Sequence, residues 1–216
     1  MCLEKGGESM PDLIAKSCAD FAYALASSEP VPGGGGAAAL TGVLAAALGA
    51  MAARLSAARK KDPAARAELE ERVQTADALR QRLLSLIDWD AAGFAPLAAA
   101  YAIPKDDPAR PEKLREASLA ACMAPLEMLR CCGETALLLE ELSGRVSPLL
   151  LSDVGCAAAL CRGALESAAM NVWVNTRGLP GDPEARALNE ETGAILESAL
   201  PRTEAVAAAV RGKLQG

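Results

Sequence analysis

Two aspartates separated by one residue are the first candidates for chemistry in this chain of 216 residues. Asp88 and Asp90 flank Trp89 and precede an Ala-rich apolar segment. A carboxylate beside apolar surface is a candidate general base, because burial raises its pKa. Two positions apart on a helix, the side chains diverge by about 200°, so they do not form a paired-carboxylate site. We expect one aspartate to face a pocket and the other water, although N-capping is the commoner role of such residues.

Four consecutive glycines, Gly33, Gly34, Gly35 and Gly36, open a long run rich in Ala and Gly. Glycine lets a ligand touch the backbone, and the free N–H groups of a helix N-terminus favour an anion. The run lacks the Gly-Lys-Ser/Thr ending of a P-loop and follows no predicted strand, which argues against a nucleotide site. It therefore indicates either a ligand-binding loop or a tight turn between packed helices.

Polar residues on a helix predicted from Ser152 to about Arg177 form a third group. Asn171 and Asn175 share a helical face, whereas Asp153 lies on that face about 27 Å away. The three cannot hold one small group, so they serve different sites or parts of a dimer interface, or Asp153 acts only as an N-cap.

Three successive cations, Arg59, Lys60 and Lys61, follow the Ala/Gly run. They complement the negative end of a helix dipole, or they bind a carboxylate of a ligand.

Composition excludes several classes of mechanism. The chain has no His, which removes Ser-His-Asp and Cys-His catalysis and most catalytic zinc sites. The seven Cys include no C-x-x-C pair, so we expect them to be structural residues rather than metal ligands. The formal charge of −6 argues against a nucleic-acid partner. The N-terminus lacks a basic segment followed by an apolar core, so we expect a cytoplasmic protein.

Apolar residues at helical spacing predict a chain made of helices, without strands. The predicted order is a helix over 11–28, the Ala/Gly helix, and a helix capped by Asp62 whose pattern continues over 88–105. A long helix over 111–142 with a kink at Pro125 follows, then the helix from Ser152, one capped by Asp182, and a last one opened by Pro201.

The fold class expected is an all-α, multi-helix bundle in one domain over residues 1–216. The uncharged run of 17 residues reaches the lower limit of a transmembrane span. Small residues at Gly42, Ala46 and Ala50 let another helix approach closely, so we interpret it as a buried central helix rather than a membrane segment.

Several segments resemble one family in the same order. Residues 29–40, EPVPGGGGAAAL, with the Ala/Gly helix and cations after them, resemble the cyclodeaminase domain of formiminotransferase-cyclodeaminases and their stand-alone bacterial methenyltetrahydrofolate cyclohydrolase relatives. Residues 88–91 with Ile103-Pro104-Lys105 are similar to the family's Asp-x-Asp-Ala segment and its Pro-Lys ending. Ser152-Asp153 and the two asparagines are similar to its last central helix.

The resemblance implies a helical homodimer that hydrolyses methenyltetrahydrofolate to formyltetrahydrofolate, with no cofactor beyond tetrahydrofolate as the carrier. Asp88 is the first candidate for acid–base work and Asp153 the second. Two alternatives stay open: an ammonia-releasing formiminotetrahydrofolate cyclodeaminase, and a non-catalytic folate-binding dimer, since Gly36 stands where the family usually has Ser. The expected ligand-binding residues are the four glycines, Lys60, Lys61 and Lys105 for the glutamate tail, and Asn171 and Asn175.

Overall fold

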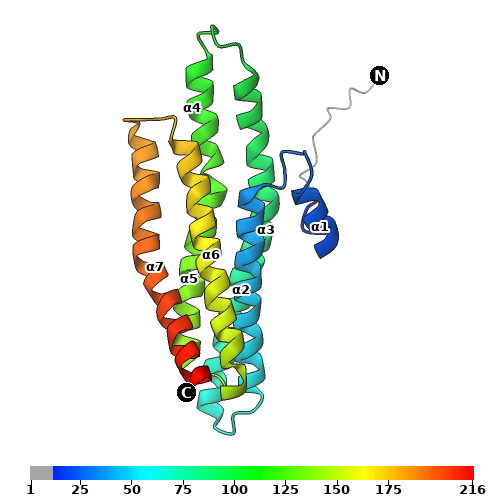
Figure 1. Cartoon of the computed structure of the whole chain (residues 1–216), viewed down its shortest axis with the longest axis vertical. Helices are drawn as coiled ribbons and strands as arrows, with labels where there is room; N and C mark the ends of the chain where they lie inside the picture. The colour runs from blue at the N-terminus through cyan, green and yellow to red at the C-terminus, as the bar shows by residue number, and fades with distance from the viewer. Residues whose placement is uncertain (1–11) are drawn as a thin grey trace.

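The computed structural model describes residues 12–216, and this range forms seven α-helices and one 3-10 turn without a strand. The all-α class is therefore confirmed for the described residues. Helices α2 to α7 run along one another in an elongated bundle, and α1 lies beside its upper half (Figure 1). The elements are α1 (Cys18–Leu25), α2 (Gly34–Ala57), α3 (Pro63–Ala102), α4 (Arg110–Ala121), α5 (Met123–Ser143), η1 (Pro148–Leu150), α6 (Leu151–Thr176) and α7 (Pro183–Gln215).

Two helix starts follow the sequence prediction. Asp62 accepts hydrogen bonds from the backbone N–H groups of Ala64 and Ala65 at the start of α3. Asp182 does the same at the start of α7 with Glu184 and Ala185. In each case proline occupies the first helical position, where its missing N–H costs nothing. Local chemistry alone decides both boundaries.

Other predicted boundaries were wrong. The first helix begins at Cys18 rather than residue 11, because the Ser17 side chain caps it through the N–H of Asp20. Residue Leu150, and not Ser152 or Asp153, is the N-cap of α6, since the turn η1 leads directly into it. Pro201 lies inside α7 and opens no new helix. Packing along a helix of 33 residues outweighs the roughly 3 kcal/mol that an interior proline costs.

At Pro125 the structure shows an interrupted helix rather than the predicted kink. The helix is interrupted at Cys122, so the expected helix over 111–142 is two helices, α4 and α5. Pro125 has no N–H to donate to the carbonyl four residues earlier, which belongs to Ala121. That carbonyl is left available to another donor.

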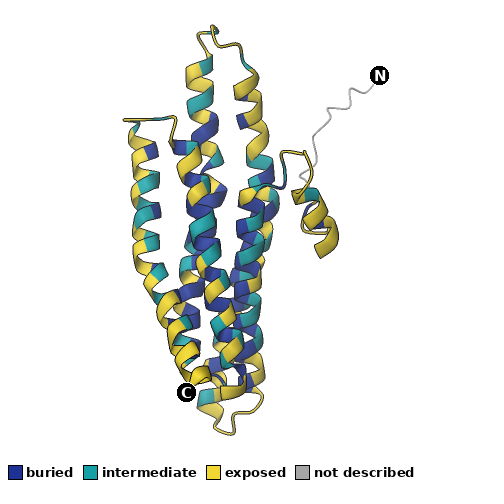
Figure 2. Cartoon of the chain, in the orientation of Figure 1, coloured by how far each residue is buried: buried dark blue, intermediate teal, exposed yellow. Residues whose placement is uncertain are grey.

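Helix α2 packs against α3, α5 and α6, and most of its residues are buried (Figure 2). Small residues make this close packing feasible. A Cβ at Gly42 would lie 3.0 Å from the Sγ of Cys132, and one at Gly49 would lie 3.2 Å from a methyl carbon of Leu139. The buried face of α2 is accordingly made mainly of Gly and Ala, while leucines of α3 and α5 supply many of the large side chains of the core.

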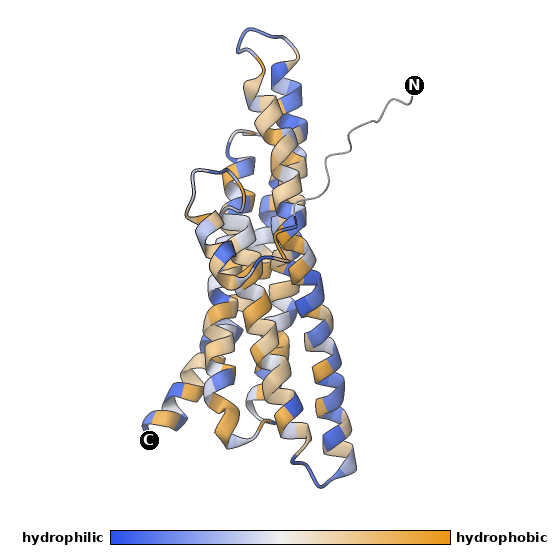
Figure 3. Cartoon of the chain, turned by 90° about the vertical axis from the view of Figure 1, so that its right-hand side faces the viewer, coloured by the Kyte–Doolittle hydropathy of each residue, from blue (hydrophilic) through white to orange (hydrophobic). Residues whose placement is uncertain are grey.

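Three helical segments are long and apolar enough to cross a membrane by length and composition alone: Gly34–Ala57, Pro63–Ala102 and Pro148–Thr176. In the first, 61% of the apolar window is buried inside the bundle. Packing against neighbouring helices therefore accounts for much of its apolar character. The loop between α2 and α3 is hydrophilic and lies at the foot of the bundle (Figure 3).

Candidate active site

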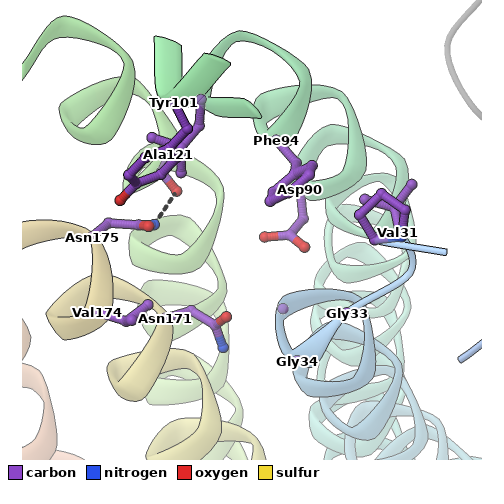
Figure 4. A pocket seen from close by; sticks show the side chains of 13 residues that line it. Val31, Gly33, Gly34, Asp90, Phe94, Tyr101, Ala121, Asn171, Val174 and Asn175 are labelled. Atoms are coloured by element: carbon purple, nitrogen blue, oxygen red, sulfur yellow. Dashed lines mark hydrogen bonds between the residues drawn. The ribbon is translucent and has the colours of Figure 1, made fainter. Parts of the chain in front are cut away.

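A cavity of about 330 Å³ lies in the upper half of the bundle, where the ends of several helices meet. The start of α2, the upper part of α3, the end of α4 and the end of α6 contribute its walls (Figure 4). Its lining residues are Pro30, Val31, Gly33, Gly34, Gly35, Asp90, Phe94, Leu97, Tyr101, Ala121, Asn171, Val174 and Asn175. Residues far apart in the sequence are thus brought to one site.

The carboxylate of Asp90 points from α3 toward the first turn of α2 (Figure 4). A Cβ at Gly35 would overlap that carboxylate, so a residue without a side chain is required there. Burial raises the pKa of Asp90 to about 6, and the backbone N–H of Gly36 opposes the shift. A carboxyl group with a pKa close to neutral can accept a proton and return it within one turnover.

The glycines of this turn differ from the predicted loop, because Gly34 to Gly36 are the first residues of α2 and Gly33 is its N-cap. The backbone N–H of Gly36 in this first turn interacts with Asp90, while Gly35 leaves room for its carboxylate. The anion held by this helix terminus is therefore the protein's own carboxylate. Gly33, Gly34 and Gly35 line the cavity, and Gly36 contributes its N–H.

Asp88, the first catalytic candidate from sequence, is not brought to the cavity. Its Oδ1 accepts the backbone N–H of Leu13 at 2.8 Å, a contact between residues 75 positions apart. The divergence of two helical positions explains why Asp90 faces the cavity while Asp88 faces the N-terminal segment. Asp90 is the other member of the predicted pair, and nothing in the neighbouring sequence shows which of the two aspartates faces the cavity.

Asn171 and Asn175 do meet at the cavity, from successive turns of α6. The Asn171 amide donates to the carbonyl of Ser167 at 2.8 Å. The Asn175 amide donates to the carbonyl of Ala121 at 3.2 Å, the same carbonyl that Pro125 leaves without a helical donor. Each NH₂ group uses one of its two N–H donors in this way. Neither amide oxygen accepts a hydrogen bond from the described residues, so both can accept one from a ligand.

The structure separates the remaining sequence candidates from this cavity to different extents. Asp153 is in the first turn of α6, about 27 Å along the helix from Asn171. Lys60 and Lys61 follow the far end of α2, about 36 Å from its glycines. Lys105 is exposed in the loop after α3, at the same end of the bundle as the cavity.

Sequence reasoning missed Phe94 and Tyr101, which line the cavity with Asp90 and Leu97. These four residues lie at spacings of four, three and four, so they share one face of α3. The signal was present in the sequence, but the same spacing is typical of ordinary core residues. Among the described residues that line the cavity, the ionisable ones are Asp90 and Tyr101. The site therefore suits a cationic ligand with flat, apolar parts.

The chain is similar in sequence to two named enzymes. The chain is 34% identical over 198 residues to the methenyltetrahydrofolate cyclohydrolase of Methylorubrum extorquens, covering 90% of this chain and 95% of that protein. It is 27% identical over 207 residues to the formimidoyltransferase-cyclodeaminase of Rattus norvegicus, covering 94% of this chain and 38% of that longer protein.

A solved structure and a family model extend the likeness. The crystal structure of formiminotetrahydrofolate cyclodeaminase from Thermotoga maritima matches with a TM-score of 0.79 at 25% identity, covering 91% of this chain and 98% of that one. The family model described as Formiminotransferase-cyclodeaminase matches residues 17–193. Because this match spans most of the chain, the protein belongs to the formiminotransferase-cyclodeaminase family, as its sequence motifs indicated.

Proposed function

We propose that the protein hydrolyses methenyltetrahydrofolate to formyltetrahydrofolate. The observation that carries the proposal is the half-buried Asp90 carboxylate, which faces a cavity with no lysine or arginine among its described lining residues. The reactive carbon of methenyltetrahydrofolate is part of a cationic amidinium, and a carboxylate stabilises that charge. The similarity to the Methylorubrum cyclohydrolase over nearly its whole length supports the same reaction.

The reaction needs one group that moves a proton twice. Asp90 would take a proton from a water molecule while the water oxygen bonds to the amidinium carbon. The protonated Asp90 would then return it to the ring nitrogen as the bond between that nitrogen and the carbon breaks. The second water proton leaves to solvent as the formyl C=O forms, so atoms and charge balance.

The other lining residues have roles in binding. The amide oxygens of Asn171 and Asn175 accept N–H groups, which the amino-pyrimidine edge of a pterin supplies. Phe94 and Tyr101 offer aromatic faces to the flat rings. Lys105 is our candidate for a carboxylate of the glutamate tail, because it lies at the same end of the bundle as the cavity.

The first experiment follows the loss of methenyltetrahydrofolate absorbance with the purified protein between pH 5 and 8. The base form of Asp90 is needed, so we expect kcat/KM to rise with pH through a midpoint near the Asp90 pKa of about 6. Folate binding without turnover of any folate tested would instead identify a non-catalytic binder and would contradict the proposed function.

A cyclodeaminase reaction is the second candidate, because the similar Thermotoga maritima structure is a formiminotetrahydrofolate cyclodeaminase. That reaction closes the ring at the same carbon and expels ammonia, and it makes the same demands on Asp90. Ammonia release from formiminotetrahydrofolate, measured beside the hydrolysis assay, separates the two. A kcat/KM for ammonia release above that for hydrolysis would assign the chain to the cyclodeaminases.

We propose further that the protein is a homodimer in which α2 is the central helix. Six outward positions on α2 alternate at spacings of four and three, the pattern of a helix packing on another helix. They carry no charge, and Leu44 and Leu55 on this face are 49% and 44% exposed. The six residues are Ala37, Thr41, Leu44, Leu48, Met51 and Leu55.

Replacing Leu44 with Glu tests the dimer. A charge buried at the proposed interface is expected to convert the dimer to a monomer at micromolar concentration, as measured by light scattering. Leu137→Glu on α5 is the matched control, since Leu137 is 45% exposed and lies outside α2. A native chain that is already monomeric, or a Leu44→Glu variant that stays dimeric, would refute this interface.

Cytoplasmic location remains a prediction. It requires that the protein stay in the supernatant after high-speed centrifugation of a lysate prepared without detergent. Recovery in the membrane pellet would favour the alternative that one of the apolar helices associates with a membrane.

A further inference from the structure

The N-terminal segment over residues 12–32, here called the arm, is held to the bundle by few contacts. At its start, Leu13 is buried and its backbone N–H donates to Asp88. In its helix α1, Phe21 is the buried residue, and it belongs to the main core. A segment anchored at so few points opens locally at a low free-energy cost.

The arm leads directly into the active-site cavity. Its last residues include Pro30 and Val31, which line the cavity, and Pro32, which precedes the glycine turn. A Cβ placed on Gly36 would lie 3.3 Å from the Cβ of Pro32 and 3.8 Å from the Cζ of Phe21. The arm therefore packs against the same turn of α2 whose backbone surrounds the Asp90 carboxylate.

Asp88 and Asp90 are therefore linked through the arm, which contacts Asp88 at its start and the glycine turn beside Asp90 at its end. Asp88 fastens the start of the arm to α3, two residues before Asp90. The arm returns through Phe21 and Pro32 to the glycine turn, which encloses Asp90 from α2. The arm thus contacts both α3, close to Asp90, and the first turn of α2.

We infer that Asp88 is a positioning residue, which holds the arm against the bundle so that the glycine turn stays packed on Asp90. This inference rests on the proposed function, in which Asp90 is the acid–base group. Asp88 acts through its Oδ1 as a hydrogen-bond acceptor and needs neither a proton to transfer nor contact with the folate. An amide oxygen in the same place should serve equally well.

The test compares Asp88→Asn, which keeps an acceptor for the Leu13 N–H, with Asp88→Ala, which removes it. We expect Asp88→Asn to keep kcat/KM within about twofold of native, and Asp88→Ala to lower it by about 10- to 100-fold. Asp153→Ala is the matched control, because it removes a carboxylate from the distant end of α6. It should leave kcat/KM at its native value.

Two readouts are independent of turnover. Amide hydrogen exchange over residues 13–32 should quicken in Asp88→Ala and stay native in Asp88→Asn. The pKa of Asp90, followed by carboxyl NMR, should fall from about 6 toward its ordinary value in Asp88→Ala as water enters.

Each outcome decides the inference. Native exchange of the arm in Asp88→Ala, or an unchanged Asp90 pKa, would overturn it. Loss of activity in Asp88→Asn with a native arm would also overturn it, and would make Asp88 a catalytic group. If the native protein turned over no folate, the proposed function would fail, while the exchange and NMR measurements would still decide whether Asp88 positions the site.

Discussion

Replacing Asp90 with Asn is expected to lower kcat for methenyltetrahydrofolate hydrolysis by about 10²- to 10⁴-fold, the range that a positioned acid–base group contributes. An amide fills the same volume against Gly35 but cannot accept the proton from water. Folate binding, measured by calorimetry, should weaken less than kcat falls, because the cavity keeps its shape. The acidic limb of the pH profile near pH 6 should disappear from any residual rate.

The same substitution should stabilise the fold at neutral pH. The folded-state pKa of Asp90 is raised above its ordinary value, so folding favours the protonated carboxyl and its ionisation opposes folding. The associated destabilisation is absent below about pH 4, grows between about pH 4 and pH 6, and stays at its full value above that. At pH 8 we expect Asp90→Asn to raise the free energy of unfolding by about 3 kcal/mol, because each pKa unit corresponds to about 1.4 kcal/mol. Urea denaturation at pH 4 and pH 8 measures the difference.

Asp153→Asn is the matched control for both effects, because it removes a carboxylate from the far end of α6. It should leave kcat within about twofold of native and should not shift the acidic limb. A loss in Asp153→Asn as large as that in Asp90→Asn, or full activity in Asp90→Asn, would show that another group moves the proton.

Gly35→Ala has the second-largest expected effect, a loss of about 100-fold or more in kcat/KM. Its new methyl group would occupy the space of the Asp90 carboxylate, so the carboxylate or the first turn of α2 must move. Overpacking of this kind also costs about 1 to 3 kcal/mol of stability. Enzyme assay and thermal unfolding of the purified variant measure both.

Gly163→Ala on α6 controls for the loss of a helical glycine, since a Cβ there meets nothing within 4 Å. It should keep full activity and stabilise the fold by up to about 1 kcal/mol. Gly35→Ala with native activity would mean that Asp90 is not packed on the glycine turn during catalysis.

The sequence predicts those features of this protein that depend on residues close together along the chain. The Asp62 and Asp182 caps need nothing beyond the proline and the N–H groups that follow them. Helical spacing and the lack of strand patterns give the all-α class for the same reason. The family motifs indicate the general location of the site, because the fold brings one of the two α3 aspartates, Asp90, together with the glycines and the α6 asparagines.

Tertiary contacts decide what the sequence left open. Asp88 and Asp90 are chemically identical, and only the position of Leu13 on one side and Gly35 on the other separates their roles. Pro201 lies inside α7 because packing along the helix holds it in place, whereas Pro125 stands in the first turn of α5, directly after the break at Cys122. The different behaviour of these two prolines does not follow from the few residues around each of them.

The charge of the cavity lining also bears on how a product would leave. In the proposed reaction the methenyl substrate arrives as a cation and is attracted to the Asp90 carboxylate. Hydrolysis converts the amidinium carbon to a neutral formyl group, so this attraction is lost at the moment of turnover. The described lining residues include no lysine or arginine that would replace it with another charge contact at the reacting centre. The chemical step itself thus weakens binding and favours product release.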